Sequence, residues 1–244
     1  MSRKRAVVTG ASGGIGAATA IALAEHGFDV ILGARRLDRL EPVAKQCGGT
    51  ALALDVTDPA SVDEFVRQTG DAHVLINNAG GAKGLDRIED AVEERWRWMW
   101  ETNVLGLMRI TKAFLPALIA SGDGHIVNIG STAGLEAYEG GAGYTSVKHG
   151  VRAITQTLRL ELLGRPVRVS EIDPGLVETE FSRVRFDGDE DRAATVYAGL
   201  TPLTADDIAA IVAFVVTRPG HVNIDQVVVR PRDQATSTRV HRRQ

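Results

Sequence analysis

The sequence predicts a single α/β domain, built on one doubly wound parallel β-sheet with helices on both faces. Short apolar runs alternate with helical stretches along the whole chain, and each run is rich in Val, Ile or Leu. This composition is typical of parallel strands that are buried on both faces. The 244 residues suffice for one large α/β domain, and no linker-like stretch or internal repeat divides them.

The expected elements alternate as strand and helix. The sheet is predicted to contain about seven strands, which span Arg5–Thr9, Asp29–Gly33, Ala51–Leu54, Val74–Asn77, Gly124–Ile129, Arg168–Ile172 and Val227–Val229. The helical stretches span Ile15–His26, Arg36–Gln46, Ser61–Thr69, Glu93–Ser121, Tyr144–Leu163 and Ala205–Val216. This order predicts right-handed crossovers. Ligands of such sheets bind beyond the carboxyl ends of the strands, so the loops that follow strands are expected to carry the chemistry.

Charge and composition argue against several classes of protein. The net charge of −3 gives no reason to expect nucleic acid as a partner. The only basic cluster lies at the end of the chain, and we separate residues 231–244 as a basic tail from a domain of residues 1–230. We expect this tail to be solvated or packed in an interface rather than to be a nucleic-acid arm.

The cysteine content and the apolar stretches of the sequence bear on the cellular compartment. Cys47 is the only cysteine, so an intrachain disulfide is ruled out and nothing points to an oxidising compartment. The basic N-terminus leads straight into a strand and lacks the features of a signal peptide. No stretch reaches the roughly 18 apolar residues of a membrane span. We therefore expect a cytoplasmic protein that has neither a membrane nor a metal site.

A glycine-rich turn follows the first strand and opens the first helix. Gly10 permits a tight turn, Gly14 lets the backbone approach a pyrophosphate, and Gly16 lets helix and strand pack closely. The helix N-terminus then offers N–H groups to phosphates. The turn therefore predicts a Rossmann-type dinucleotide site, and its expected contacts are Gly10, Ser12, Gly13, Gly14, Ile15 and Gly16.

Three residues separate the first two glycines, and this spacing resembles the short-chain dehydrogenase/reductase family. The end of the second strand indicates which nicotinamide cofactor binds. Ala34 occupies the place where the resemblance would put the acid of an NAD-binding protein, and Arg35 and Arg36 follow. An arginine fork matches a phosphate, so we expect NADP(H) bound by residues 1–230 as one catalytic domain. The alternative is that both arginines merely begin a solvated helix.

Two further loops extend the resemblance. Asp55 and Val56 follow the third strand and look like the family's adenine-contacting pair, although Asp55 could instead serve a turn or a helix cap. Asn78, Ala79 and Gly80 belong to an Asn-Asn-Ala-Gly element after the fourth strand, where small residues let the backbone pass close to the cofactor.

A tyrosine and a lysine mark the candidate catalytic site. Tyr144 and Lys148 lie four residues apart at a helix start, hence on one face. A nearby ammonium, together with an oxidised nicotinamide, favours phenolate, so Tyr144 could exchange the proton that accompanies hydride transfer. Ser131 follows the fifth strand and can hold the reacting oxygen, unless it is only a cap or turn residue.

The resemblance assigns further roles. Asn103 corresponds to an asparagine that helps hold a water linking the lysine to solvent, or else it is a packed polar residue. Gly130 stands where many family members have another serine. The Pro-Gly element after the sixth strand lies over the nicotinamide in the family, and its expected cofactor contacts here are Pro174, Gly175, Val177 and Thr179.

The final third of the chain is similar to the NADP-dependent 3-hydroxy acid (serine) dehydrogenase branch, in residues 177–186, 199–204 and 217–224. This resemblance implies an alcohol–carbonyl interconversion of a small 3-hydroxy acid, and a broad ketone or aldehyde reductase is the alternative. A carboxylate substrate calls for a nearby cation, and Arg185 leads the candidates before Arg183 and Lys83. Tyr138 is the one aromatic in the glycine-rich stretch before Tyr144 and a candidate substrate contact.

A homo-oligomer is also expected, because the helix of residues 93–121 builds the dimer interface in the family, where tetramers are common. Trp96 and Trp100 fit one side of this helix, which leaves Trp98 as the candidate for a subunit contact. Two rival functions remain: a lyase, epimerase or sugar-modifying enzyme on the same fold, and a catalytically silent NADP sensor. Such sensors usually lose the tyrosine or the lysine, and both are present.

Overall fold

A computed structural model describes residues 3–243. Met1 and Ser2 of the predicted domain and Gln244 of the predicted tail therefore lie outside the described residues. Its centre is a seven-stranded sheet in the order β3-β2-β1-β4-β5-β6-β7, with every pair parallel. The strands are β1 (Arg5–Thr9), β2 (Asp29–Ala34), β3 (Thr50–Ala53), β4 (Val74–Asn77), β5 (Gly124–Ile129), β6 (Val167–Pro174) and β7 (Gln226–Val229). The predicted doubly wound sheet is confirmed.

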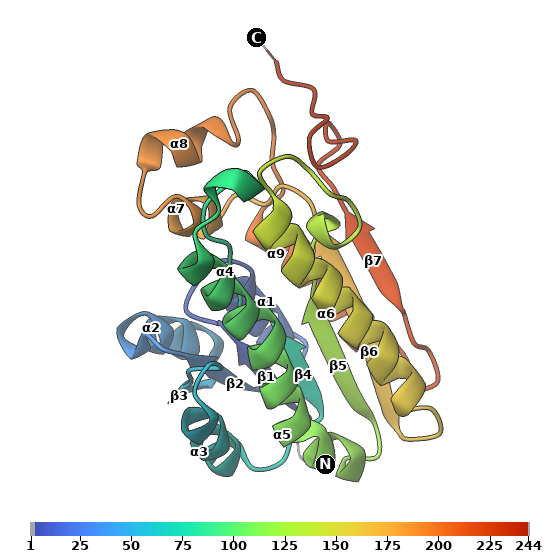
Figure 1. Ribbon diagram of the computed structural model, residues 1–244. Coiled ribbons are helices and arrows are strands. Elements are labelled where there is room, and N and C mark those ends of the chain that lie inside the picture. Colours follow the sequence, from blue (N-terminus) through green and yellow to red (C-terminus); the bar gives the residue numbers. More distant parts are fainter. Residues whose placement is uncertain (1–2, 244) are drawn as a thin grey trace.

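Helices cover both faces of this sheet (Figure 1). One layer holds α1 (Gly14–Glu25), α2 (Leu37–Cys47) and α9 (Ala205–Val216), and the other holds α3 (Pro59–Thr69), α5 (Gly106–Ala120) and α6 (Ala142–Glu161). Two apolar clusters, one on each side of the sheet, form the core. The strands β5 and β6 are buried at every position, as expected for parallel strands covered on both faces, although β6 also buries polar side chains.

The predicted helix of residues 93–121 is divided in the structure. It consists of α4 (Glu93–Trp100), a π-helical turn (Glu101–Leu105) and α5. The π turn holds Asn103, and such turns are frequent at functional sites. By length and composition, Glu93–Ala120 would also suffice to cross a membrane, which the sequence reading did not anticipate, but here it packs against β4, β5, α3 and α6.

Short elements that the sequence did not predict lie at the carboxyl end of the sheet. The helices α7 (Phe181–Arg185) and α8 (Glu190–Thr195) stand beyond the strand ends (Figure 1), while 3₁₀ turns occupy Ile88–Asp90 and Thr132–Gly134. Helices this short have no apolar periodicity to detect. They lie in the segments after β4, β5 and β6, which fold back over the strand ends.

The expected roles of two tryptophans are reversed. Trp98 joins a small apolar cluster with Trp96 and Met99, and the Lys83 Nζ lies 5.8 Å from the centroid of its ring. Trp100 is 40% exposed. The prediction that Trp98 points away from its own chain was wrong, because the loop after β4 folds over that side of α4.

Candidate active site

A cavity of about 590 Å³ opens at the carboxyl ends of the strands, which is within the ordinary size of a small-molecule site. It brings together the loops after β1, β4, β5 and β6, the start of α6, and part of the C-terminal tail. Most of the predicted site residues line it: Gly10, Ser12, Gly13, Gly14, Ile15, Arg36, Asn78, Ala79, Gly80, Ser131, Tyr138, Tyr144, Lys148, Pro174, Gly175, Val177, Thr179 and Arg185. Five predicted residues do not line it, namely Gly16, Arg35, Asp55, Val56 and Asn103.

The glycine loop between β1 and α1 has the expected shape. Gly10 and Gly14 have positive φ angles of 66° and 54°. Gly16 lies beneath the loop, where an added Cβ would come within 2.5 Å of the Gly10 carbonyl oxygen. The side-chain amide of Asn78 braces this turn by donating to the carbonyl oxygens of Thr9 and Gly10, at 2.9 and 3.2 Å. Backbone and small residues thus leave the helix N-terminus open to the cavity.

An ion-pair cluster stands at the edge of this loop. The Arg36 guanidinium lies 3.5 Å from the Ser12 hydroxyl and 3.7 Å from the Glu180 carboxylate. Arg39, which the sequence reading missed, donates to both oxygens of Glu180 at 3.0 Å. The first turn of α2 therefore adds a second cation beside Arg36.

Asp55 and Val56 lie away from the cavity walls. The Asp55 carboxylate accepts hydrogen bonds from the backbone N–H and the hydroxyl of Thr57, at 2.9 and 2.7 Å. Burial alone would raise the pKa of Asp55, but these hydrogen bonds and the charge of Arg35 lower it. Val56 packs against Gly106 at the start of α5. These contacts agree with the turn role that was left open for Asp55, and its contact with adenine stays a prediction.

Asn103 is buried in the π turn and is fully hydrogen-bonded. Its amide group donates to the carbonyl oxygens of Gly81 and Met99, at 3.0 and 2.8 Å, and its oxygen accepts from the Gly81 N–H at 3.2 Å. A Cβ on Gly80 would lie 2.6 Å from that oxygen. Asn103 therefore fixes the loop after β4, which lines the cavity.

Ser131, Tyr144 and Lys148 converge where β5 meets α6. The Ser131 hydroxyl lies beside the Tyr144 phenol and acts to lower its pKa. The Lys148 Nζ lies 5.8 Å from the centroid of the Tyr144 ring and donates to the Ile129 carbonyl oxygen at 2.9 Å. Ser131 also accepts from the Ala133 N–H at 3.1 Å, so it caps the 3₁₀ turn of residues 132–134 and lines the cavity at the same time. The three predicted side chains thus share one corner of the cavity.

The environment changes the acidity of both ionisable groups. Burial raises the pKa of Tyr144 to about 12, although the Ser131 hydroxyl and the charge of Arg185 act in the opposite direction. Burial lowers the pKa of Lys148 to about 8, against the opposing effect of two nearby carboxyls. In the protein alone, the Tyr144 pKa is thus raised rather than lowered, because burial outweighs the nearby positive charge.

The three candidate cations for a substrate differ in their partners. Arg183 forms ion pairs with Glu180 and Glu190, and Lys83 forms one with Asp187. Arg185 instead donates to two neutral acceptors, the Gly84 carbonyl oxygen at 2.9 Å and the Tyr138 hydroxyl at 3.2 Å. Its guanidinium carbon lies 5.7 Å from the centroid of the Tyr144 ring. The structure therefore separates Arg185 from the other two.

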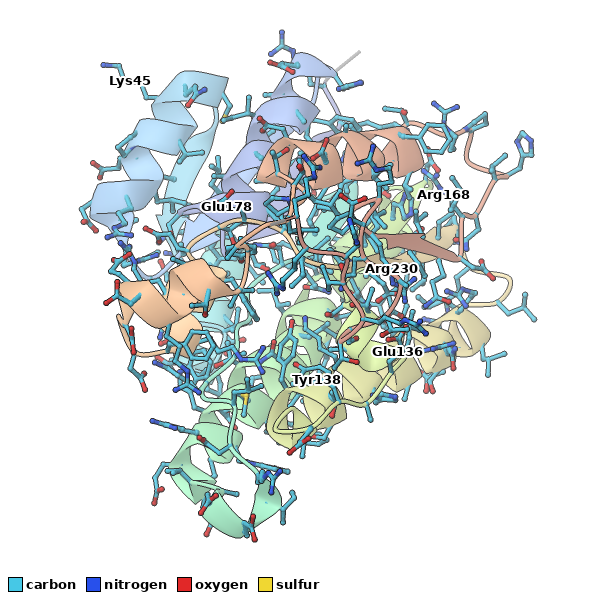
Figure 2. The ribbon with its side chains drawn as sticks, turned by 90° about the horizontal axis from the view of Figure 1, so that it is seen from above. Lys45, Glu136, Tyr138, Arg168, Glu178 and Arg230 are labelled. Atoms are coloured by element: carbon cyan, nitrogen blue, oxygen red, sulfur yellow. The ribbon has the colours of Figure 1, made fainter. Side chains whose placement is uncertain are left out.

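The C-terminal tail also contributes to the cavity. Gln234 accepts from the Leu176 N–H at 2.9 Å, and the Arg243 N–H donates to the Gly199 carbonyl oxygen at 2.8 Å. Arg230 pairs with Glu136 at 2.6 Å, and Figure 2 shows these two side chains together near Tyr138. Tail residues that line the cavity are Gln234, Ser237, Thr238, Val240 and Arg242.

Phe181 was not assigned a role from the sequence, yet it lines the cavity with its ring 5.5 Å from that of Tyr144. Its position two residues after the predicted Thr179 contact was the one available signal. For the tail residues there was none, because their place depends on the whole fold.

Comparisons with known proteins agree with this geometry. Residues 4–190 match the family model described as short chain dehydrogenase. An uncharacterized oxidoreductase of Mycobacterium tuberculosis is 61% identical over 98% of this chain and 95% of its own length. An NADP-dependent 3-hydroxy acid dehydrogenase of Schizosaccharomyces pombe is 41% identical over 99% of this chain and 97% of its own.

Among solved structures, the closed form of serine dehydrogenase complexed with NADP+ superimposes with a TM-score of 0.93, at 38% identity over 98% of this chain and all of that one. These relatives match this chain over nearly their full length, and the family model covers the glycine loop. The solved structure has the same fold as this chain. The chain therefore belongs to the short-chain dehydrogenase family of oxidoreductases.

Proposed function

We propose that the protein is an NADP(H)-dependent dehydrogenase of small 3-hydroxy acids, which interconverts the alcohol and its carbonyl compound. The juxtaposition of Ser131, Tyr144 and Arg185 at one end of the cavity carries this proposal. Two relatives are named for NADP and for 3-hydroxy acid or serine substrates, which supports the same assignment.

The residues present fit NADP(H). Glycines line the cavity beside the N-terminus of α1, where a pyrophosphate would accept hydrogen bonds from backbone N–H groups. Arg36 and Arg39 stand at the edge of that loop, where an added phosphate on the ribose would find two cations. When bound, the cofactor supplies or accepts the hydride.

Tyr144 moves the proton. In the oxidation direction its phenolate takes the proton from the alcohol oxygen while the hydride leaves the carbon that bears this oxygen, and in the reverse direction the phenol returns the proton to the oxygen. Ser131 donates to the reacting oxygen, where negative charge develops. Lys148, buried behind the tyrosine, stabilises the phenolate by its charge.

Arg185 selects an acid substrate. It reaches the Tyr144 ring from α7 and has neutral hydrogen-bond acceptors, so a substrate carboxylate would be its counter-charge. A carboxylate held there keeps the hydroxyl of a short acid within reach of the phenol. This contact distinguishes an acid dehydrogenase from a general ketone reductase.

Exposed apolar residues support the expected oligomer. Trp100, Leu105 and Met108 are 40%, 37% and 40% exposed along the helix of residues 93–120. We place the subunit contact of a homo-oligomer on this face.

The direct test is an assay of NADP reduction by serine and short 3-hydroxy acids, next to NADPH oxidation with neutral ketones. We expect acid turnover in the wild type, and Tyr144→Phe to lower kcat by about a thousandfold with NADPH Kd nearly unchanged. Binding of NADPH without turnover on any substrate would favour a cofactor sensor. Equal turnover of neutral ketones and acids would favour a general reductase.

A further inference from the structure

Two acidic side chains of β6 lie buried directly behind the catalytic corner. Glu171 and Asp173 are 2% and 0% exposed, and they point to the same side of the strand because they are two residues apart. Both reach under Gly130, the residue that joins β5 to Ser131. A Cβ on Gly130 would overlap the Asp173 carboxylate and come within 2.7 Å of a Glu171 oxygen. The missing side chain at Gly130 is thus what makes room for this pair.

The two carboxyls differ in their partners. Asp173 accepts from the Ser131 N–H at 2.9 Å with one oxygen and from the Gln226 amide at 2.6 Å with the other. Glu171 has an oxygen that is fully buried and has no donor among residues 3–243. A buried acceptor without a donor is costly, unless the group itself carries a proton and donates.

The charges around the pair favour one shared proton. The titratable groups that face it are Lys148 and Tyr144, both from α6, whereas β7 contributes the Gln226 amide and β5 contributes Gly130. Burial and the neighbouring Asp173 raise the pKa of Glu171, and burial raises the pKa of Asp173 as well. Two carboxylates so close and so deep do not both ionise near neutral pH.

We propose that Glu171 and Asp173 form a proton-sharing carboxyl pair that positions Ser131 and balances the charge of Lys148 during catalysis. Glu171 holds the proton and donates to the Asp173 carboxylate. Asp173 fixes the backbone of Ser131, so that its hydroxyl meets the Tyr144 phenol. The pair then presents one negative charge to one ammonium. This inference rests on the proposed function, because it assigns the pair to the same proton transfer.

The proton-sharing role predicts a change in the pH profile. At alkaline pH the wild-type pair loses its shared proton, and the second negative charge makes phenolate formation at Tyr144 harder. Glu171→Gln cannot lose a proton, so its Tyr144 ionises more readily. We compare the wild-type and Glu171→Gln profiles for NADPH-dependent reduction after each is normalised to its own value near neutral pH. In the variant, the alkaline limb should then fall at a pH lower by about half a unit or more.

The control for this profile is Glu161→Gln, which removes an exposed carboxylate from the end of α6. Its profile should match that of the wild type. If Glu171→Gln also gives the wild-type profile through the whole alkaline limb, with unchanged melting temperature, the proton-sharing role is wrong.

The positioning role is tested at Asp173. Asp173→Ala removes the acceptor for the Ser131 N–H, and we expect kcat to fall about a hundredfold while NADPH Kd changes less than threefold. Asp173→Asn keeps an acceptor oxygen, so it should recover at least about a tenth of the wild-type kcat. If Asp173→Ala does not fold, Asp173→Asn and Glu171→Gln still decide the question, because both keep the size of the side chain.

The outcomes separate the two proposals. A wild type that binds NADPH but turns over no alcohol or carbonyl compound contradicts the proposed function. An active wild type that is inactivated by Tyr144→Phe, but is unaffected by the substitutions at Glu171 and Asp173, contradicts the carboxyl pair alone. Parallel loss of kcat and NADPH binding in both Asp173 variants would mark a purely structural residue.

Discussion

The cofactor side and the substrate side of the cavity are built from different materials. The cofactor side consists of backbone and small residues in Thr9–Gly16 and Asn78–Gly80, which brace one another over short distances. The substrate side consists of long side chains from Tyr138, Phe181, Arg185 and the tail, which are far apart in the sequence. The cofactor side therefore requires glycines, where a side chain would have no room. The substrate side requires charged and aromatic side chains in defined positions. Each side should respond to a different kind of mutation.

The largest effect is expected where the cofactor side has no space. Gly16→Ala would place a Cβ 2.5 Å from the Gly10 carbonyl oxygen, and the backbone there cannot move away easily. We expect a loss of about 3 kcal/mol in the free energy of unfolding, measured by denaturant titration of the free protein. Gly13→Ala is the matched control, because its Cβ would meet nothing nearer than a Glu180 oxygen at 3.9 Å. Equal stability of the two variants would contradict the steric account.

The next effect tests the charge on the substrate side. Arg185→Leu should lower kcat/KM for 3-hydroxy acids by about a hundredfold, because a charge-assisted hydrogen bond to the carboxylate is lost. Neutral ketones should lose less than threefold. Arg183→Leu serves as the control, since Arg183 is already paired with Glu180 and Glu190. Equal losses for acids and neutral ketones in Arg185→Leu would show that the guanidinium acts on Tyr144 and not on the substrate.

A smaller effect tests whether side chains also matter on the cofactor side. Arg36→Leu should raise the Kd of NADPH about tenfold and leave that of NADH nearly unchanged, because only NADPH carries the extra phosphate. The loss is limited because Arg39 lies in the first turn of α2, beside Arg36. Fluorescence titration of both cofactors measures it. A parallel loss for NADH would assign Arg36 to the adenine or the ribose instead.

The smallest effect concerns the contact that joins the two sides. Glu180 leads into α7 and pairs with Arg36 and Arg39, so its carboxylate competes with a phosphate for the same cations. Glu180→Gln should tighten NADPH binding about threefold, the scale of an exposed ion pair. Glu178→Gln removes an exposed neighbouring carboxylate and should leave the Kd unchanged. Weaker NADPH binding in Glu180→Gln would mean that Glu180 orders the arginines for the phosphate.

The sequence by itself determined those features that local geometry fixes. Apolar runs of strand length, separated by helical periods, specify a parallel sheet, because each face of each strand must be covered. The helical repeat alone places Tyr144 and Lys148 on one face. Gly10 and Gly14 predict a turn with positive φ angles, which other residues adopt only with strain. These relationships extend over a few residues, so they can be read without the rest of the chain.

Only the tertiary structure decided what depends on burial and on distant partners. It separated Arg185 from Arg183 and Lys83 by their counter-charges, and it turned Asp55 toward Thr57. It also set the Tyr144 pKa, which the nearby cations would lower but burial raises. Electrostatic free energy depends on the distance between charges and on how much water surrounds them, and neither is fixed until the loops after β5 and β6 meet the tail.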